Sequence, residues 1–237
     1  MKFKIAAEIF EKLPHFCAGI VVVKGFDNSK HYPEIDILLE QAVAAGEKRF
    51  ADVKVKESPL ITPYREAFQA LDINPNKFQC SAEALFTRIA KGKGLPHINP
   101  LVDLNNAISL TYTLPMGTHD LGISEQDIEM RPAKDDDSFI PFGATESKSV
   151  PAGEVVYAVG NQVRTRRWTW RQSEIGKIGT DTTYVFFPID GFIGVNDDTV
   201  RQAASTLADM LKKFGSCEVK TGFVDKSAPE MDLTLNG

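Results

Sequence analysis

The chain has 237 residues, of which 43% are hydrophobic, and a formal net charge of −5. This apolar content is sufficient for one full core, and no segment reaches the roughly 18 to 20 apolar residues of a membrane helix, so a soluble single domain over residues 1–237 is expected. The acidic balance argues against an indiscriminate nucleic-acid binder, whose affinity comes from summed phosphate neutralisation. Three distant cysteines without CxxC spacing and the lack of a signal-peptide pattern favour a cytoplasmic protein with reduced thiols.

The first half of the chain combines two strand patterns with several helix signals. Apolar runs predict strands over Lys4–Phe10 and Phe16–Phe26. Pro33 opens a segment with apolar residues at helical spacing, which predicts a helix that stops at Gly46. Three further helices are predicted to start at residues whose side chains can cap a first turn: Thr62, Ser81 and Asn99.

After Gly117 the pattern changes to short strands separated by turns. The predicted strands are Asp127–Arg131, Val155–Gly160, Val163–Arg171 and Thr183–Ile189. A helix with a regular apolar stripe is expected between Asp197 and Gly215, before a last strand over Cys217–Val224. Because helices and strands do not alternate strictly, an α+β fold with mixed sheets and flanking helices is expected rather than a doubly wound parallel sheet.

Candidate site residues gather in the stretch Leu95–Leu121. Its polar members are His97, Asn99, Asp103, Asn105, Asn106, His119 and Asp120. They must face water, one another or a ligand, because an unpaired buried polar atom costs roughly 1–3 kcal/mol. Helical spacing puts Asp103 and Asn106 on one face and Asn105 elsewhere, which fits either a ligand site or a local capping network.

His119 and Asp120 allow two interpretations. An imidazole oriented by a carboxylate can act as a general base near neutral pH, whereas an ordinary exposed turn would give the pair no role. A metal site would need His97, Asp103, His119 and Asp120 as ligands, but no two of them have the spacing that metal ligands show on a helix or a hairpin. No metal site is therefore predicted.

The segment Val163–Arg171 carries four arginines and two tryptophans. As a strand it would place Arg164, Arg166, Trp168 and Trp170 on one face, with Arg167 and Arg171 on the other. Aromatic rings beside guanidinium groups suit base stacking and phosphate neutralisation in single-stranded RNA. The alternative is that the tryptophans are core residues and the arginines pair with acids. The RNA-binding interpretation rests on Arg164, Arg166, Arg167, Trp168 and Trp170.

Several motifs together resemble the B3/B4 tRNA-editing domain of the phenylalanyl-tRNA synthetase beta subunit, and resemble its free-standing bacterial relatives still more. They are PYREAFQALDINPNK, SAEALFTRIAKGKGLPHINPLVDLNNAISL, LPMGTHDL, RRWTWRQS and GTDTTYVFF, in consistent order from about Tyr64 to Ile189. The resemblance implies a three-layer β/β/α domain with a pocket in which, in the synthetase, water hydrolyses tyrosine wrongly esterified to tRNA.

The resemblance also implies roles for individual residues. The family's VD-x-x-N element falls on Val102, Asp103 and Asn106, and its neighbouring pocket position falls on Asn105. Its histidine loop corresponds to His119 and Asp120, and its threonine strand follows Thr182. By this match Asn105, Asn106 and His119 are candidate catalytic residues. The expected substrate-binding residues are Asn99, Asp103, Asp120, Arg171, Gln172, Thr182 and Asp190.

The chain departs from the synthetase pattern in three places. The interval from Asn106 to His119 is about two residues longer, and Arg171 and Gln172 replace a glycine pair. Pro188 stands where the synthetase has the glutamate that recognises the tyrosine hydroxyl, with Asp190 two residues further on. Loss of that acceptor should change the amino acid recognised, because a site built to bind a hydroxyl discriminates by about 10⁴-fold or more. Arg171 could hold a carboxylate, phosphate or ester oxygen.

The leading functional hypothesis is a stand-alone deacylase that acts in trans on the aminoacylated 3′ end of a mischarged tRNA. Water would attack the ester, with His119 or the terminal ribose hydroxyl taking a proton and Asn105, Asn106 or backbone N–H groups stabilising the oxyanion. No metal, cofactor, DNA or membrane partner is implied. The alternatives are a non-catalytic tRNA- or RNA-binding module of the same fold and an amino-acid-binding protein without an RNA partner.

Overall fold

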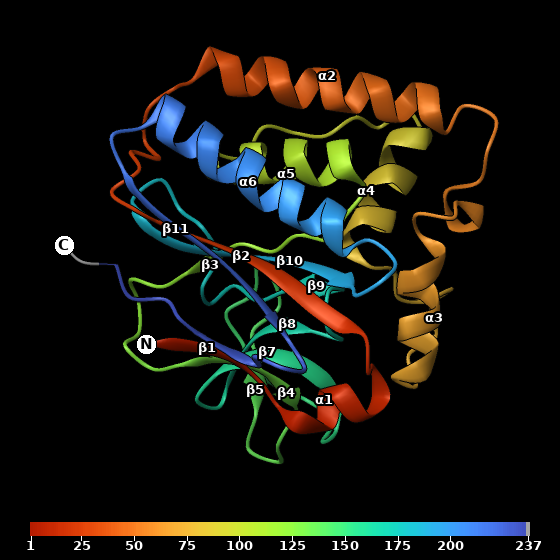
Figure 1. Ribbon diagram of the computed structural model, residues 1–237, viewed down its shortest axis with the longest axis vertical. Helices are drawn as coiled ribbons and strands as arrows, with labels where there is room; N and C mark the ends of the chain where they lie inside the picture. The colour runs from red at the N-terminus through yellow and green to blue at the C-terminus, as the bar shows by residue number, and fades with distance from the viewer. Residues whose placement is uncertain (236–237) are drawn as a thin grey trace.

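Three layers are stacked in the computed structural model, which describes residues 1–235: helices, a four-stranded sheet and an eight-stranded sheet (Figure 1). The helices are α1 (Ala7–Lys12), α2 (Pro33–Arg49), α3 (Thr62–Ala70), α4 (Ser81–Ala90), α5 (Pro100–Tyr112) and α6 (Asp197–Phe214), with a 3-10 turn η1 (Val55–Glu57). The strands are β1 (Lys2–Ile5), β2 (Phe16–Lys24), β3 (His119–Asp120), β4 (Ile128–Pro132), β5 (Ser138–Phe139), β6 (Lys148–Ser149), β7 (Val155–Val159), β8 (Gln162–Arg166), β9 (Arg171–Gln172), β10 (Tyr184–Phe192), β11 (Glu218–Asp225) and β12 (Glu230–Asp232). The expected three-layer α+β fold is confirmed.

The four-stranded sheet is the middle layer and has the strand order β11-β2-β10-β3 in the described residues. β2 and β10 pair antiparallel along their whole length, from Lys24 opposite Tyr184 to Phe16 opposite Phe192. All residues of β2 except Lys24 are buried, because helices cover one face of the sheet and the second sheet covers the other. A continuous apolar run is the sequence expected of a strand covered on both faces.

Helix α6 packs directly on β2, β10 and β11. Two glycines permit this close approach. A Cβ on Gly191 would lie 2.4 Å from Cγ2 of Val200, and a Cβ on Gly19 would lie 2.8 Å from Cγ1 of the same valine. Both distances are shorter than van der Waals contact, so the absence of side chains at these positions sets the separation between helix and sheet.

The eight-stranded sheet forms the outer layer, with the order β12-β1-β4-β7-β8-β5-β6 and β9 paired to β8 within residues 1–235. β1 runs parallel to β4 and antiparallel to β12, so strands from the two ends of the described chain are neighbours. Aromatic side chains fill the space between the sheets. The ring of Phe3 lies 5.8 Å from that of Tyr157 and 5.0 Å from that of Phe186.

Local predictions were wrong in several segments. α3 and α4 begin at Thr62 and Ser81, but these residues do not cap them: the N-cap positions are Ile61 and Cys80, and neither helix has a side-chain cap. The first strand ends at Ile5, and α1 follows where the strand was expected to continue to Phe10. α2 continues through Gly46 to Arg49, and Gly46 has no left-handed backbone; the lack of a side chain there leaves room for the ring of Phe86 from α4. The strand predicted over Val163–Arg171 ends at Arg166 and turns. Among the described residues, none of the helices has the length and apolar character needed to cross a membrane.

Candidate functional site

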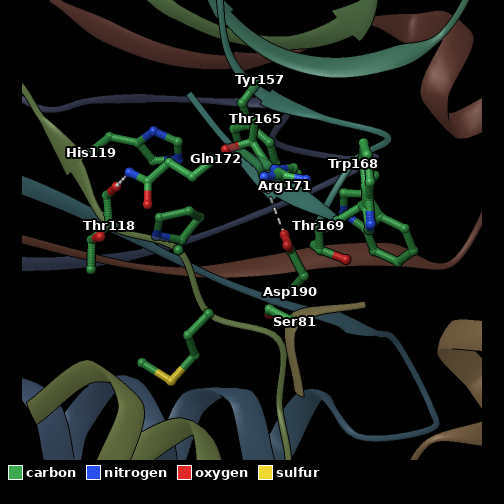
Figure 2. Close-up of a pocket in the computed structure, with 14 residues that line it drawn as sticks. Ser81, Thr118, His119, Tyr157, Thr165, Trp168, Thr169, Arg171, Gln172 and Asp190 are labelled. Carbon is green, nitrogen blue, oxygen red and sulfur yellow. Dashed lines mark hydrogen bonds between the residues drawn. The ribbon is translucent and has the colours of Figure 1, made fainter. Parts of the chain in front are cut away.

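A cavity of about 110 Å³ lies between the two sheets, near the end of β10, and is called the inter-sheet pocket here (Figure 2). It is lined by Ser81, Met116, Gly117, Thr118, His119, Tyr157, Thr165, Trp168, Thr169, Trp170, Arg171, Gln172, Pro188 and Asp190. Alternate residues of a strand point to the same face, so Pro188 and Asp190 of β10 both face the eight-stranded sheet. The pocket is therefore assembled from segments far apart in the chain.

Asp190 places a buried carboxyl group in this pocket. Its Oδ1 accepts a hydrogen bond of 2.7 Å from the hydroxyl of Tyr157, which comes from β7 of the opposite sheet. Burial raises the pKa of Asp190 to about 7, although Tyr157 and the nearby indole of Trp168 act in the opposite direction. The Trp168 indole approaches this carboxyl without forming a hydrogen bond of good geometry. Asp190 is thus a group whose charge changes near neutral pH.

The backbone of Asp190 is also fixed by hydrogen bonds. Its carbonyl accepts a bond of 2.8 Å from the hydroxyl of Tyr64, and that hydroxyl accepts a bond of 2.8 Å from Nδ2 of Asn196. Its N–H donates to the carbonyl of Pro115 at 3.0 Å. These contacts tie β10 to α3, to the segment before α6 and to the loop that leads to β3, so the carboxyl has a defined position.

His119 forms the opposite wall of the pocket, on the two-residue strand β3. Its ring lies 5.6 Å from the ring of Tyr157 and 5.8 Å from that of Phe186. Burial, assisted by the positive charge of Arg164, lowers the pKa of His119 to about 3. The imidazole is therefore neutral at physiological pH, and its Nδ1 is buried without a hydrogen-bond partner.

A turn between β8 and β9 brings the remaining polar side chains to the pocket. Arg167 and Trp168 have positive φ angles of 46° and 59°. The backbone N–H of Trp168 donates a hydrogen bond of 2.7 Å to the carbonyl of Val155. Left-handed backbone is uncommon for such residues and reverses the direction of the chain. β9 then presents Arg171 at the exposed rim, while Nε2 of Gln172 donates to the carbonyl of Thr118 at 2.5 Å.

Several buried polar atoms around this cavity have no partner within the described chain. They are Oγ of Ser81, Nδ1 of His119, Nε1 of Trp168 and Oγ1 of Thr169. Buried polar groups in folded proteins are almost always hydrogen-bonded, and an unpaired one costs about 1–3 kcal/mol. Their concentration around one cavity indicates a site that a polar ligand completes.

The structure places part of the sequence-predicted set in this pocket and part elsewhere. His119, Arg171, Gln172 and Asp190 line it. Asp120 and Thr182 instead bond to each other, with Oγ1 of Thr182 donating to Oδ2 of Asp120 at 2.8 Å, and they stabilise the neighbouring loop. Sequence reasoning missed Tyr157, Thr169 and Ser81, because an apolar strand and two hydroxyl residues carry no local motif.

Asn105 and Asn106 do not line the inter-sheet pocket. Both lie on α5, which belongs to the helix layer (Figure 1), and neither is among the residues that line the pocket between the two sheets. Asn105 is buried with its Oδ1 unpaired, and Asn106 is half-buried. Their expected meeting with His119 in one pocket is therefore not found.

Asn99 and Asp103 lie at the start of α5. Asn99 caps the helix as predicted, since its side chain accepts from Val102 N–H at 3.1 Å. Asp103 accepts from Ile98 N–H at 2.9 Å and lies 3.1 Å from Nδ1 of His97, which is also 3.4 Å from Asp36. Asp36, His97 and Asp103 could together surround a cation, but the same contacts explain them as a link between α2 and α5.

The predicted RNA-facing strand is corrected in two of its members. Arg164 and Trp168 are buried, with exposed fractions of 2% and 0%, so neither can stack on or pair with RNA. Trp168 packs edge-on against Phe16 and Phe68 because the left-handed turn directs it inward. Arg166 forms two hydrogen bonds with the Glu154 carboxylate, at 2.7 and 2.8 Å.

The other two members, Arg167 and Trp170, remain half-buried at the pocket rim. The guanidinium of Arg167 lies 4.0 Å from the ring centroid of Phe78 and 4.8 Å from that of Trp170. Arg167 also pairs with Glu154 at 3.2 Å. Phe78, Trp170 and Arg171, with Lys77 beside them, form a cluster of aromatic and cationic side chains, called the rim cluster here.

A three-layer α+β domain with a polar pocket between its sheets is the class of protein that this geometry defines. The family model of the B3/4 domain matches residues 63–216, and the chain belongs to that family. The fold is similar to that of an N-terminal fragment of the phenylalanyl-tRNA synthetase beta subunit from Pyrococcus horikoshii, with a TM-score of 0.51 and 11% sequence identity. That match covers 92% of this chain and 49% of the fragment, so the chain spans about half its length. No curated protein sequence matches the chain.

Proposed function

We propose that this protein is a trans-acting, cytoplasmic hydrolase of aminoacyl-tRNA esters and that the inter-sheet pocket holds the aminoacyl group. The observation that carries the proposal is the set of unpaired buried polar atoms around one cavity, next to a rim of aromatic and cationic side chains. The B3/4 family and the fold shared with a phenylalanyl-tRNA synthetase fragment support tRNA as the partner.

In the proposed reaction, a water oxygen bonds to the ester carbonyl carbon and the ester C–O bond to the ribose breaks. The ribose oxygen leaves with the proton that water gives up, relayed through the neighbouring ribose hydroxyl. His119 is too weak a base for this relay, because its pKa is about 3. A neutral imidazole N–H can instead polarise a carbonyl, and His119 takes that role here.

Arg171 supplies the positive charge of the site. Its side chain is exposed at the rim and lies over the ring of Trp170 at 5.8 Å, where a guanidinium can reach either the developing oxyanion or the terminal phosphate. Gln172 holds the β3 segment through the Thr118 carbonyl and so positions His119. Asn105 and Asn106 have no part in this mechanism, because they lie in the helix layer.

The rim cluster suits the single-stranded end of a tRNA. Bases stack on aromatic side chains with about 1–3 kcal/mol each, and nearby cations neutralise phosphates. Phe78 and Trp170 offer the rings, with their centroids 4.8 Å apart, and Lys77 and Arg171 offer the charges. A 3′-terminal adenosine placed on this rim would direct its ester into the pocket.

The test is a deacylation assay with a panel of tRNAs that carry labelled amino acids, including mischarged species. We expect selective loss of label from one mischarged tRNA, and about 10²-fold slower loss for Arg171→Ala and His119→Gln. Ser205→Ala, at an exposed position of α6, is the matched control and keeps the wild-type rate. Unchanged label on every tRNA, or full activity of both pocket variants, would contradict the proposal.

The acidic net charge favours one other function, that of an amino-acid-binding protein without an RNA partner. A ligand that binds only the folded state stabilises it by mass action. In that case free amino acids would raise the melting temperature, whereas uncharged and charged tRNA would leave it unchanged.

A further inference from the structure

The inter-sheet pocket is too small for an aromatic amino acid. An apolar cavity of about 150 Å³ accommodates benzene, whereas this one measures about 110 Å³. The pocket cannot easily widen on the side of Trp168, because the indole packs against other aromatic rings. Its ring centroid lies 5.7, 5.7 and 6.0 Å from those of Phe16, Phe68 and Phe192. A side chain of a few heavy atoms fits the volume.

The polar groups at the Asp190 end specify the chemistry of that side chain. Among the described residues the Asp190 carboxyl accepts a hydrogen bond of good geometry only from Tyr157, at Oδ1, so its second oxygen can receive a ligand donor. The indole N–H of Trp168 can only donate and therefore needs an acceptor, and Thr169 adds an unpaired hydroxyl (Figure 2). Asp190, Trp168 and Thr169 are at least nine-tenths buried, with exposed fractions of 1%, 0% and 9%.

A hydroxyl group meets these demands with a single heavy atom, since it donates one hydrogen bond and accepts others, whereas a carboxamide does so only with two more heavy atoms in a small pocket. An ammonium group can donate to Asp190 but cannot accept from the indole N–H, and a carboxylate has no hydrogen to donate to the Asp190 carboxylate. A hydrocarbon side chain would leave every one of these atoms unpaired, which is the most unfavourable arrangement.

We propose that the inter-sheet pocket selects a small hydroxyl-bearing amino acid, threonine or serine, with Asp190, Trp168 and Thr169 as the specificity-determining residues. This rests on the proposed function in that the amino acid arrives as a tRNA ester. Pro188 and Asp190 lie on the same face of β10 and both line the pocket, and of the two it is Asp190 that offers a hydrogen-bond acceptor. A tyrosine side chain is larger than benzene and so exceeds the volume of about 110 Å³ between the pocket walls.

The experiment uses pairs of amino acids that differ only at the hydroxyl group, which is replaced by a methyl group in one pair and by a hydrogen in the other. Threonine is compared with valine, and serine with alanine, first as esters on tRNA and then as non-hydrolysable amides of 3′-amino-3′-deoxyadenosine. We expect threonine to exceed valine by about 10³-fold or more in kcat/KM, because a site built for a hydroxyl strongly rejects the analogue that lacks it. The amides should bind in the same order in a calorimeter, with the tyrosyl amide weakest.

Thr169→Val is the diagnostic variant, because it removes one hydroxyl and keeps the side-chain shape. It should lower the preference for threonine over valine by about 10-fold, mainly through kcat/KM for threonine, while Ser205→Ala leaves it unchanged. Melting temperatures of both variants establish that they fold.

The outcomes separate this inference from the proposed function. Preference for the threonyl amide without any ester hydrolysis would support the selectivity and overturn the hydrolase. Hydrolysis of valyl and threonyl esters at equal rates, or tighter binding of the tyrosyl amide, would overturn the selectivity and leave the hydrolase standing.

Discussion

His119 and Asp190 are buried in one pocket but have pKa values displaced in opposite directions. The pKa of His119 falls from 6.5 to about 3. Between these pH values the unfolded chain binds a proton at this residue and the folded chain does not, so the contribution of His119 to the free energy of unfolding rises with pH. The pKa of Asp190 rises from 3.8 to about 7. Between these pH values the folded chain keeps a proton on this residue that the unfolded chain has lost, so the contribution of Asp190 to the free energy of unfolding falls with pH. Between about pH 4 and 6.5 the two effects cancel.

A substitution of either residue should reveal the pH dependence of the free energy of unfolding that the other residue causes. Asp190→Asn leaves the histidine effect, so the free energy of unfolding relative to wild type should rise by up to about 1.4 kcal/mol per pH unit from about pH 4 to 6.5. His119→Gln leaves the aspartate effect and should give the opposite slope up to about pH 7. Urea denaturation at several pH values measures both. Parallel pH profiles for all three proteins would contradict the assigned protonation states.

At the level of residues, the sequence indicated His119, Arg171, Gln172 and Asp190 through a family resemblance, and the structure places them around one cavity. It could not indicate Tyr157, which looks like any aromatic residue of an apolar strand. The contact between Tyr157 and Asp190 depends on two sheets meeting face to face, and no local pattern encodes that meeting.

At the level of elements, α6 and the sheet beneath it are held at a distance set by glycine. Gly191 lies opposite Val200, and any side chain there would force the helix outwards. Gly191→Ala should lower the free energy of unfolding by about 1–3 kcal/mol, the usual effect of overpacking a tight contact. Ser205→Ala on the exposed face of α6 is the control, and chemical denaturation is the measurement. Equal stability of the two variants would show that the helix can shift without penalty.

The turn between β8 and β9 is the element where sequence reasoning failed most clearly. Strict alternation placed Trp168 on one strand face with Arg164 and Arg166 and left open whether that face binds RNA or the tryptophans are core residues. Two consecutive left-handed residues reverse the side-chain directions, and Trp168 is a core residue. Glu154 helps to hold this turn by pairing with Arg166 and Arg167. Left-handed backbone at arginine and tryptophan is imposed by such tertiary contacts, so propensity could not predict it. By contrast, the helices after Pro33 and Asn99 begin as predicted, because proline and a capping asparagine are local signals.

For the whole molecule, the net charge of −5 limits how nucleic acid can bind. Few cations stand at the rim, and Arg167 among them is paired with Glu154. Binding should therefore depend on stacking more than on phosphate neutralisation.

We expect RNA oligonucleotides ending in CCA to bind with a shallow salt dependence, of roughly one to two counterions released. Arg171→Ala should reduce that slope by about 0.7, and Lys213→Ala, on α6 in the helix layer, should leave it unchanged. Fluorescence anisotropy over about 50 to 200 mM salt measures the slope. A steep slope that is unaffected by Arg171→Ala would place the RNA elsewhere on the surface.

The three-layer architecture was predictable through the resemblance, but the strand order was not. Neighbours such as β1 with β12 and β2 with β10 come from distant parts of the chain, and hydrophobic periodicity carries no information on which distant strand will pair.

The pairing of β1 with β12 and of β2 with β10 and β11 also constrains the order of assembly during synthesis. A ribosome delivers β2, a strand that is buried except at Lys24, long before Phe192 and Asp225 exist to flank it. Contacts between residues far apart in the chain form slowly, and unpaired apolar strands are prone to aggregation while they wait. β1 and β2 are synthesised well before their partner strands and are thus among the last to be secured, so we expect the nascent chain to be prone to aggregation until β10 to β12 have been made.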